Sequence, residues 1–329
     1  MTPDVPVLPL TGLEGGTLTG FLAALGVLRL LGEQDASVRL GWSPEPPHPA
    51  RLTWPDAAEA MEEALAAQLR QRVAPLQIFP GKSRLKEVTP AEYRGALQAA
   101  MAQPDPLLAD LLGSLGSDAA VQVTKSGETA LMDPPWCVLD GAQQRHLLIS
   151  IRQMQDLMSV SAQASMMEER NRPLEKLRAT LQGPWPAMDR KASLYLEPTR
   201  RDHAYQWSDP MRQPLLSAGL ANLLALVGLS WWPAMPHLHQ GEVRLAVAGC
   251  TESGSGRTAI TWPLWSSMVS AGAVRRLLLS PAMQDPSDDF QALGVTRLYR
   301  AEVRRHHKGP KMFEASQCVW RSGGDDEQL

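Results

Sequence analysis

Two long apolar segments constrain this chain most, because each has to be covered on nearly every side. In residues 17–31 the apolar side chains recur at helical spacing, and Arg29 carries the only charge. Residues 215–229 form a second such segment, and no Asp, Glu, Lys or Arg occurs anywhere in residues 213–240. Asn222 and Gly228 dilute it, so we expect a buried helix rather than a membrane span.

Glycines lie inside the first of these helices, at Gly20 and Gly26. A glycine lowers helix stability unless another backbone packs closely against it. The spacing therefore predicts that the helix over residues 17–31 is buried and closely approached by neighbouring chain.

The rest of the chain indicates a mixture of helices and short strands. Thr89-Pro90-Ala91-Glu92 is a capping box that opens a helix to about residue 102. Further helices are predicted over residues 55–72, 106–112, 142–158, 163–181 and 266–279. Strands are predicted over residues 7–10, 121–124, 193–196, 243–248 and 258–262, with a final strand from residue 295.

The fold class that follows is α+β, a helix-rich mixed fold with two poorly separated lobes. Gly183-Pro184-Trp185-Pro186 is the candidate boundary between them. We expect a helix-rich N-terminal lobe over residues 1–183 and an α/β C-terminal lobe over residues 184–329.

The distribution of charge is more informative than its total. The chain has 329 residues and a formal net charge of −3, which excludes a protein that is basic all over. Residues 70–94 and 170–212 each carry +4, and residues 291–321 carry +5. Solvated surface explains any one of these segments about as well as a binding face does. The three cysteines and the absence of a signal-like start lead us to expect a cytoplasmic protein without a disulfide framework.

The third basic segment is the best candidate for contacts to nucleic acid. Alternation along a strand places Arg300 and Arg304 on one face together with Glu302, and Tyr299 on the other. Such a face suits phosphate contacts, which position nucleic acid without reading its sequence. The residues selected for backbone contacts are Arg300, Arg304, Arg305, Lys308 and Lys311.

The other two basic segments are secondary candidates. Lys82, Arg84 and Lys86 alternate in the same way. Arg200 and Arg201 belong to a segment in which aromatic residues interleave with positive charge, a pattern typical of single-strand binding. An ordinary exposed surface over buried aromatics accounts for that pattern nearly as well.

Motifs for catalysis or metal binding are weak. Gly81-Lys82-Ser83 resembles the end of a phosphate-binding loop, but Leu76 stands where that motif requires glycine. His237 and His239 lack a third ligand nearby in the sequence. We therefore expect a protein that is not an enzyme, with no metal and no cofactor.

Several short stretches together resemble proteins encoded with type I-G (formerly I-U) CRISPR systems. They include an amino-terminal signature and motifs spread over most of the chain. These are Leu13-Glu14-Gly15-Gly16, Gly20 to Arg29, Leu115-Gly116-Ser117-Asp118, Leu194-Tyr195-Leu196-Glu197-Pro198, Arg200 to Tyr205, Gly219-Leu220-Ala221-Asn222, Trp262-Pro263-Leu264-Trp265 and Gly294 to Arg305. Leu196-Glu197-Pro198 stands where the family has Trp-Asp-Pro, and Gly219-Leu220-Ala221-Asn222 where it has Gly-Ala-Asn.

The resemblance implies a non-catalytic subunit in RNA-guided interference against invading DNA. Both a large-subunit-like protein and an extension of the helicase–nuclease fit it. The implied partners are the other effector subunits, the helicase–nuclease, the crRNA and the target DNA, with no membrane. A protein-only adaptor that recruits the helicase–nuclease is the alternative, and a nuclease is less favoured because the sequence has no clustered carboxylates.

Overall fold

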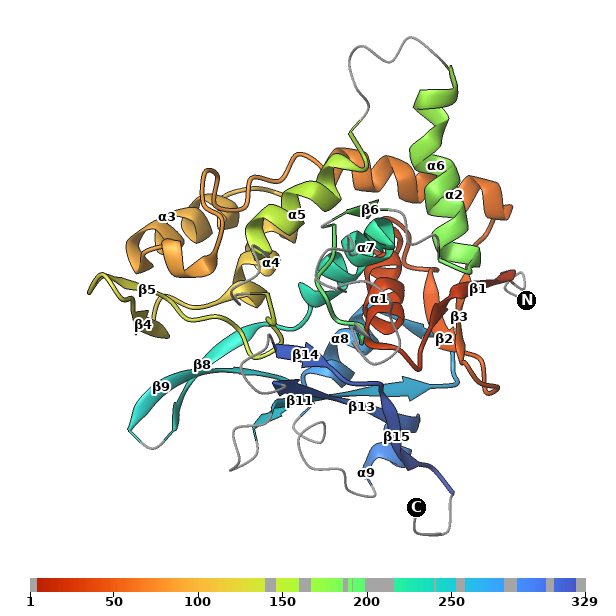
Figure 1. Cartoon of the computed structure of the whole chain (residues 1–329). Coiled ribbons are helices and arrows are strands. Elements are labelled where there is room, and N and C mark those ends of the chain that lie inside the picture. The colour runs from red at the N-terminus through yellow and green to blue at the C-terminus, as the bar shows by residue number, and fades with distance from the viewer. Residues whose placement is uncertain are drawn as a thin grey trace, which may run out of the picture.

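The fold is a mixed α+β arrangement in which helices cover one side of several antiparallel sheets (Figure 1). The computed structural model describes residues 5–139, 146–159, 167–185, 189–190, 192–198, 216–239, 241–252, 258–280, 289–305 and 311–323. The helix-rich α+β class predicted from the sequence is confirmed.

The described helices and strands follow each other along the chain in mixed order. The helices are α1 (Leu18–Gly32), α2 (Ala58–Gln68), α3 (Pro90–Met101), α4 (Leu107–Leu115), α5 (Leu147–Asp156), α6 (Met167–Gln182), α7 (Gly219–Leu229), α8 (Ala271–Leu278) and α9 (Asp289–Ala292). The strands are β1 (Val7–Glu14), β2 (Arg39–Trp42), β3 (Pro49–Thr53), β4 (Val121–Val123), β5 (Thr129–Leu131), β6 (Asp189–Arg190), β7 (Leu216–Ser217), β8 (Ala234–His239), β9 (Glu242–Val247), β10 (Cys250–Glu252), β11 (Thr258–Trp265), β12 (Val269–Ser270), β13 (Val295–Arg305), β14 (Lys311–Phe313) and β15 (Gln317–Arg321).

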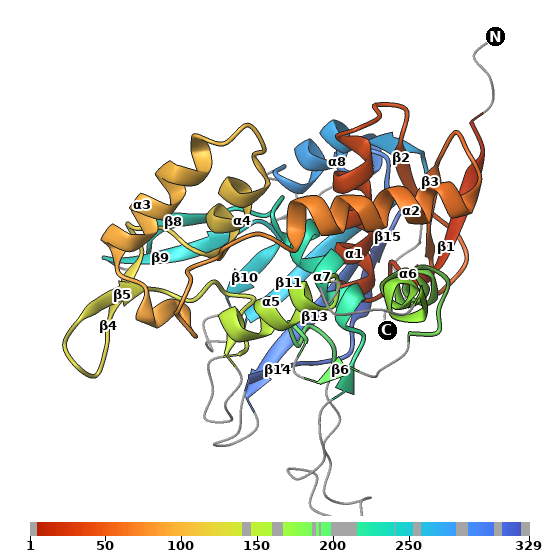
Figure 2. The same ribbon diagram turned by 90° about the horizontal axis from the view of Figure 1, so that it is seen from above.

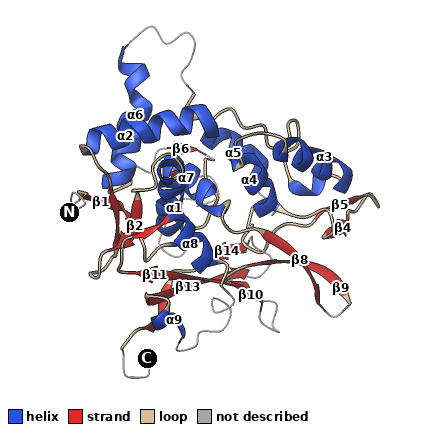
Figure 3. Ribbon diagram, turned by 180° about the vertical axis from the view of Figure 1, so that it is seen from behind, coloured by secondary structure: helices blue, strands red, loops and turns tan. Residues whose placement is uncertain are grey.

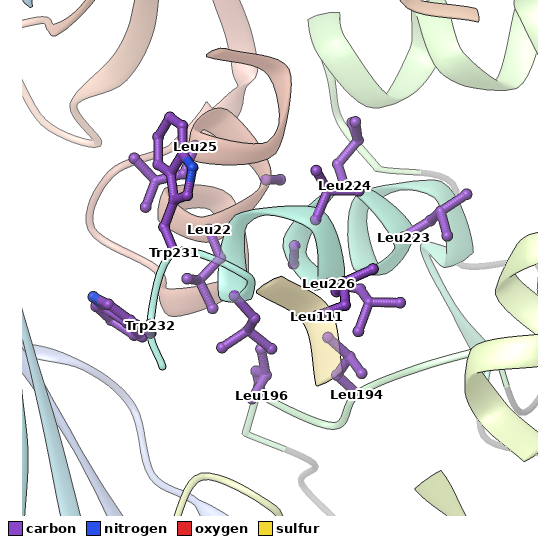
Figure 4. Packing of buried hydrophobic residues seen from close by; sticks show 14 of the residues in the cluster. Leu22, Leu25, Leu111, Leu194, Leu196, Leu223, Leu224, Leu226, Trp231 and Trp232 are labelled. Carbon is purple, nitrogen blue, oxygen red and sulfur yellow. The ribbon is translucent and has the colours of Figure 1, made fainter. Parts of the chain in front are cut away.

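The two apolar helices pack against each other at the centre of the molecule. Every residue of α7 is buried, and α1 is buried from Leu18 to Leu31. A Cβ atom added to Gly26 would lie 2.1 Å from the Leu224 carbonyl oxygen, and one added to Gly228 would lie 2.0 Å from that of Leu22. The close backbone approach predicted for the first helix is therefore present, and leucines of both helices fill the space around it (Figure 4). Helices α2 and α6 pack nearby (Figure 2).

Two larger antiparallel sheets lie beside this helix pair. One has the order β1-β3-β2-β12, and the other joins β10, β11 and β13, with β14 and β15 both paired to β13. Aromatic residues connect the sheets to α1 and to each other: Phe21 of α1 stacks on Trp42 of β2 at 5.6 Å, and the indole of Trp265 on β11 donates to the Leu40 carbonyl of β2 at 2.9 Å.

The helix predicted from the Thr89 capping box is confirmed, since Thr89 and Glu92 cap α3 reciprocally. The strand predicted over residues 193–196 is wrong. Tyr195 has a φ of 58°, and the Asn222 side chain accepts a hydrogen bond from the Leu194 amide at 2.8 Å, which holds this stretch in an irregular path. The strand from Val295 is also not the final one, because β14 and β15 follow it.

The interior continues across the candidate boundary at residue 183. A single cluster of buried apolar residues extends from Leu10 to Phe313. Strand β12 completes the sheet that begins with β1, and α1 packs on α7. The proposed lobes thus share one core, and their division at this point stays a prediction.

Strands β8 and β9 form a hairpin that extends from the body (Figures 1 and 3). Its register places apolar side chains opposite each other on one face. The base of that face is buried at Ala234, Leu245 and Val247, whereas Leu238 at its tip is 74% exposed and Val243 is 40% exposed. An apolar surface therefore runs from the core out into solvent.

Candidate nucleic-acid interface

The outer face of the β11–β13 sheet carries two of the selected arginines. Register pairs Arg300 with Thr261 and Glu302 with Ala259, so these side chains share one face, while Ala301 and Val303 point into the core. Arg300 is exposed and contacts the Thr251 hydroxyl at 3.4 Å. The predicted alternation is thus correct.

Arg304 has two acidic neighbours on this face. Its guanidinium lies 3.2 Å from Glu302 and 3.0 Å from Glu314. Exposed ion pairs of this kind add little stability, but they balance the arginine charge. Among the described side chains here, the two arginines are matched by two glutamates.

Lys311 lies apart from Arg300 and Arg304. It pairs with Arg305 at the end of β13, two residues along from the inward-facing Val303–Phe313 pair. Lys311 is therefore on the same face of the sheet as that pair, opposite to the face of Arg300 and Arg304. Its side chain borders a pocket of about 460 Å³ together with Glu242, Arg244 and Glu252. The structure therefore does not bring the described members of the predicted group onto one face.

Three of the selected residues and one selected side chain lie outside the described part of the chain. Arg200, Arg201 and Lys308 are not among the described residues, and Arg305 is described only in its backbone.

The Lys82 segment folds as a turn rather than a strand, so the predicted alternation there is wrong. Residues Leu85–Glu87 form a single 3₁₀ turn. Lys82 forms an ion pair with Glu92 at 2.8 Å, and Arg84 forms one with Glu87 at 2.7 Å. The Lys82 interaction and the Thr89 hydrogen bonds lower the pKa of Glu92, as expected for a carboxylate inside a capping box. Lys86 also has an interaction partner. These cations hold the entry to α3 together.

Segments that carry the type I-G resemblance meet around the amino terminus of α1. The Trp262 indole donates to the Gly15 carbonyl at 2.9 Å, and the Tyr299 ring lies against Gly16. The Thr19 amide donates to the Glu197 carboxylate at 3.3 Å. The Gly15–Gly16 turn is thereby held by strands and a loop that are up to about 280 residues away along the chain.

A pocket of about 490 Å³ opens beside this turn. Its lining includes Glu14, Thr17, Trp185 and Glu197. Burial raises the pKa of the Glu197 carboxyl, and the nearby Glu14 charge adds to this, while hydrogen bonds from Thr19 act in the opposite direction. Glu197 is not among the site residues predicted from the sequence, although it lies in the Leu194–Pro198 motif of the resemblance.

Two further arginines of this sheet are not among the residues predicted from the sequence. Arg297 on β13 and Arg321 on β15 are directly opposite each other in the register. The available signal was the same alternation, which places Arg297 on the Tyr299 face. The pairing to Arg321 depends on β15, which was not predicted.

Metal ligation has no support within the described ranges, where no three His, Cys, Asp or Glu side chains are grouped to hold an ion. His237 and His239 lie side by side on β8 with ring centroids 6.2 Å apart. In the same part of the chain, no helix combines the length and apolarity needed to cross a bilayer.

No protein-family model and no curated protein matches this chain.

Proposed function

We propose that this chain is a non-catalytic subunit of a type I-G CRISPR effector and takes part in RNA-guided interference against invading DNA. It contacts nucleic acid (crRNA and target DNA) and other effector subunits, including the helicase–nuclease, in the cytoplasm. It needs no metal or cofactor of its own for this role.

One observation carries the proposal: residues from five of the short motifs behind the resemblance are neighbours in space. Gly15, Gly16, Glu197, Trp262 and Tyr299 come from four separate motifs and lie around one helix terminus. Asn222, from a fifth motif, fixes the backbone that leads to Glu197. Chance matches scattered along a chain have no reason to meet at one place in the fold, so this arrangement supports a common origin for them.

Co-purification with the implied partners tests the proposal. The full chain is expressed with the type I-G effector proteins and a crRNA, and the effector is isolated through a tag on another subunit. We expect this chain in the complex at a fixed ratio, and loss of plasmid interference when its gene is deleted. A complex that assembles and interferes equally well without the chain contradicts the proposal.

The contribution of the outer face to DNA binding is measured separately. Charge reversal at Arg300, Arg304 and Lys311 removes the described cations of the predicted group. Each lost phosphate contact should lower the slope of log affinity against log salt by about 0.9 for duplex DNA. If DNA binding by the assembled complex keeps its salt slope, these residues are not backbone contacts.

The β8–β9 hairpin favours a second candidate, a protein-only adaptor that recruits the helicase–nuclease. Its exposed Leu238 and Val243 continue an apolar face that is otherwise buried. Large exposed apolar surface is typical of protein–protein contacts. For an adaptor, the isolated chain shows no salt-dependent nucleic-acid binding, yet it binds the helicase–nuclease.

A further inference from the structure

Arg297 and Arg321 form an unusual cross-strand pair. They are directly opposite each other on β13 and β15, so their side chains leave the sheet on the same face. Like charges in this position destabilise a sheet. Among the described residues, no carboxylate pairs with either arginine to offset the repulsion.

The described neighbours of the pair are a thiol and two rings, and the Cys318 and Tyr299 side chains raise the pKa of Arg321. The next pair on the same face is Tyr299 and Cys318, and the His48 ring packs edge-on against Tyr299 at a centroid distance of 5.9 Å. Burial lowers the pKa of His48, and the charges of both arginines lower it further, although its contact with the Ser43 carbonyl and the Glu45 charge oppose this. His48 is therefore neutral near pH 7.

We propose that Arg297 and Arg321 together hold a phosphate group of a nucleic-acid backbone. Two guanidinium groups present forked N–H donors that match phosphate oxygens, and a bound anion removes the repulsion between them. Arg321 is exposed and Arg297 partly so, and neither borders the two pockets described above. An open site of this kind suits a polymer that passes over the surface better than a small free anion, which favours an enclosed pocket.

This inference rests on the proposed function and deepens it, because it names a contact residue pair for the nucleic acid. The pair also lies close to the Gly15–Gly16 turn, since Tyr299 contacts both Gly16 and His48. Nucleic acid bound at this pair passes beside the place where the motifs of the resemblance meet.

The test compares two double variants of the isolated full chain. R297Q/R321Q removes the pair, and R70Q/R276Q removes the same charge from exposed arginines on the helical side. Binding of a labelled duplex and of a labelled single strand is measured by fluorescence anisotropy over a range of salt concentrations. We expect R297Q/R321Q to lower the salt slope for duplex by about 0.9, for the one phosphate that the pair holds, and R70Q/R276Q to leave it near that of the wild type.

A lysine variant distinguishes the contribution of the forked guanidinium contacts to DNA binding from the contribution of positive charge alone. R297K/R321K keeps both charges, so its salt slope should stay near the wild-type value while its affinity falls, because lysine does not form the forked contact. It also provides a reading if R297Q/R321Q does not fold. Equal slopes and affinities for wild type, R297Q/R321Q and R297K/R321K overturn the inference.

Thermal unfolding distinguishes nucleic acid from a free anion. In phosphate-free buffer, R297Q/R321Q should melt at or above the wild-type temperature, since the repulsion is gone. If inorganic phosphate stabilises the wild type through this pair while DNA binding is unaffected by R297Q/R321Q, the site serves a small anion and the nucleic-acid assignment is wrong. Failure of the chain to join a type I-G effector would instead overturn the proposed function, and it leaves these readouts on the isolated chain unchanged.

Discussion

The hydrogen atom that serves as the side chain of Gly228 faces the backbone of α1. Replacing it by a methyl group puts a Cβ atom 2.0 Å from the Leu22 carbonyl oxygen, so the two helices have to move apart. We expect Gly228→Ala to lower the free energy of unfolding by about 3 kcal/mol, measured by urea unfolding.

Gly95→Ala is the matched control for this substitution. Gly95 is exposed within α3 and an added Cβ meets nothing within 4 Å. Alanine should raise stability there by up to about 1 kcal/mol, because it favours the helix. Equal effects at both positions would show that the close approach of α1 and α7 does not limit the side chain at residue 228.

Asp110 is expected to matter more than an aspartate in an exposed pair. It lies 2.6 Å from Arg29, which is fully buried in α1 and also contacts Glu33 and Ser230. Removing one partner of a buried pair leaves the other charge poorly compensated, so Asp110→Ala should destabilise the protein by about 3 kcal/mol. Asp118→Ala breaks the exposed pair with Arg94, and a change of under about 1 kcal/mol in urea unfolding is expected.

Glu197 predicts a dependence of stability on pH. Its pKa is raised in the folded protein, chiefly by burial, so the folded state holds this proton more tightly than the unfolded state. Its contribution to stability is then present at low pH and is lost as pH rises from the ordinary pKa of a glutamate, 4.5, through the raised folded pKa. Glu197→Gln should therefore be more stable than the wild type at pH 7, and the difference should vanish in acid.

Glu92 should show the opposite dependence of stability on pH in the same assay. Its pKa is lowered by Lys82 and Thr89, so its contribution is present at neutral pH and lost in acid. Glu92→Gln should be less stable than the wild type at pH 7. If thermal unfolding across pH shows the same sign for both variants, burial does not raise the pKa of the Glu197 carboxyl.

At the level of elements, substitutions at the tip of the β8–β9 hairpin should affect partner binding without affecting stability. Leu238 is 74% exposed, so Leu238→Ser together with Val243→Ser should change stability by less than about 0.5 kcal/mol per residue in thermal unfolding. For an adaptor, the same variant should lose binding to the helicase–nuclease in a pull-down. Val123→Ser, on the separate β4–β5 hairpin and 75% exposed, is the control and should retain binding.

Elements with local signals were predictable from the sequence, and those made by pairing were not. The Thr89–Glu92 cap and the glycine-containing helix are encoded within a few residues of each other. Strand β15 is short, and its residue types do not alternate between polar and apolar. It is a strand because it pairs with β13, which the sequence of β15 alone does not indicate. The Arg297–Arg321 pair could not be predicted either, because it depends on that pairing. The face shared by Arg300 and Arg304 could be predicted, because it follows from alternation within one strand.

For the whole molecule, the shared core predicts that the two proposed lobes do not fold alone. A fragment of residues 1–183 lacks α7 and β12, and a fragment of residues 184–329 lacks α1 and β2. We expect each fragment to lack cooperative thermal unfolding, and the mixture to recover it at least in part. Independent cooperative unfolding of both fragments would support the division at residue 183.

Candidate sites were harder to predict than the fold because charge balance depends on the tertiary structure. The sequence shows Lys82 and Arg84 as unpaired cations, yet Glu92 and Glu87 lie against them in the structure. Arg304 likewise has Glu314 beside it only because β14 leads back along β13. A count of charges along a segment therefore overestimates the positive surface available to a ligand.

The packing of α1 on α7 has a consequence during protein synthesis. Almost the entire surface of α1 is apolar, and its principal helical partner begins at Gly219, about 190 residues after α1 ends. At roughly 5–20 residues per second, a ribosome needs on the order of 10–40 s to make that stretch. Throughout this interval the nascent chain presents an apolar helix without its final cover, which makes it a substrate for chaperones that bind such segments on the ribosome.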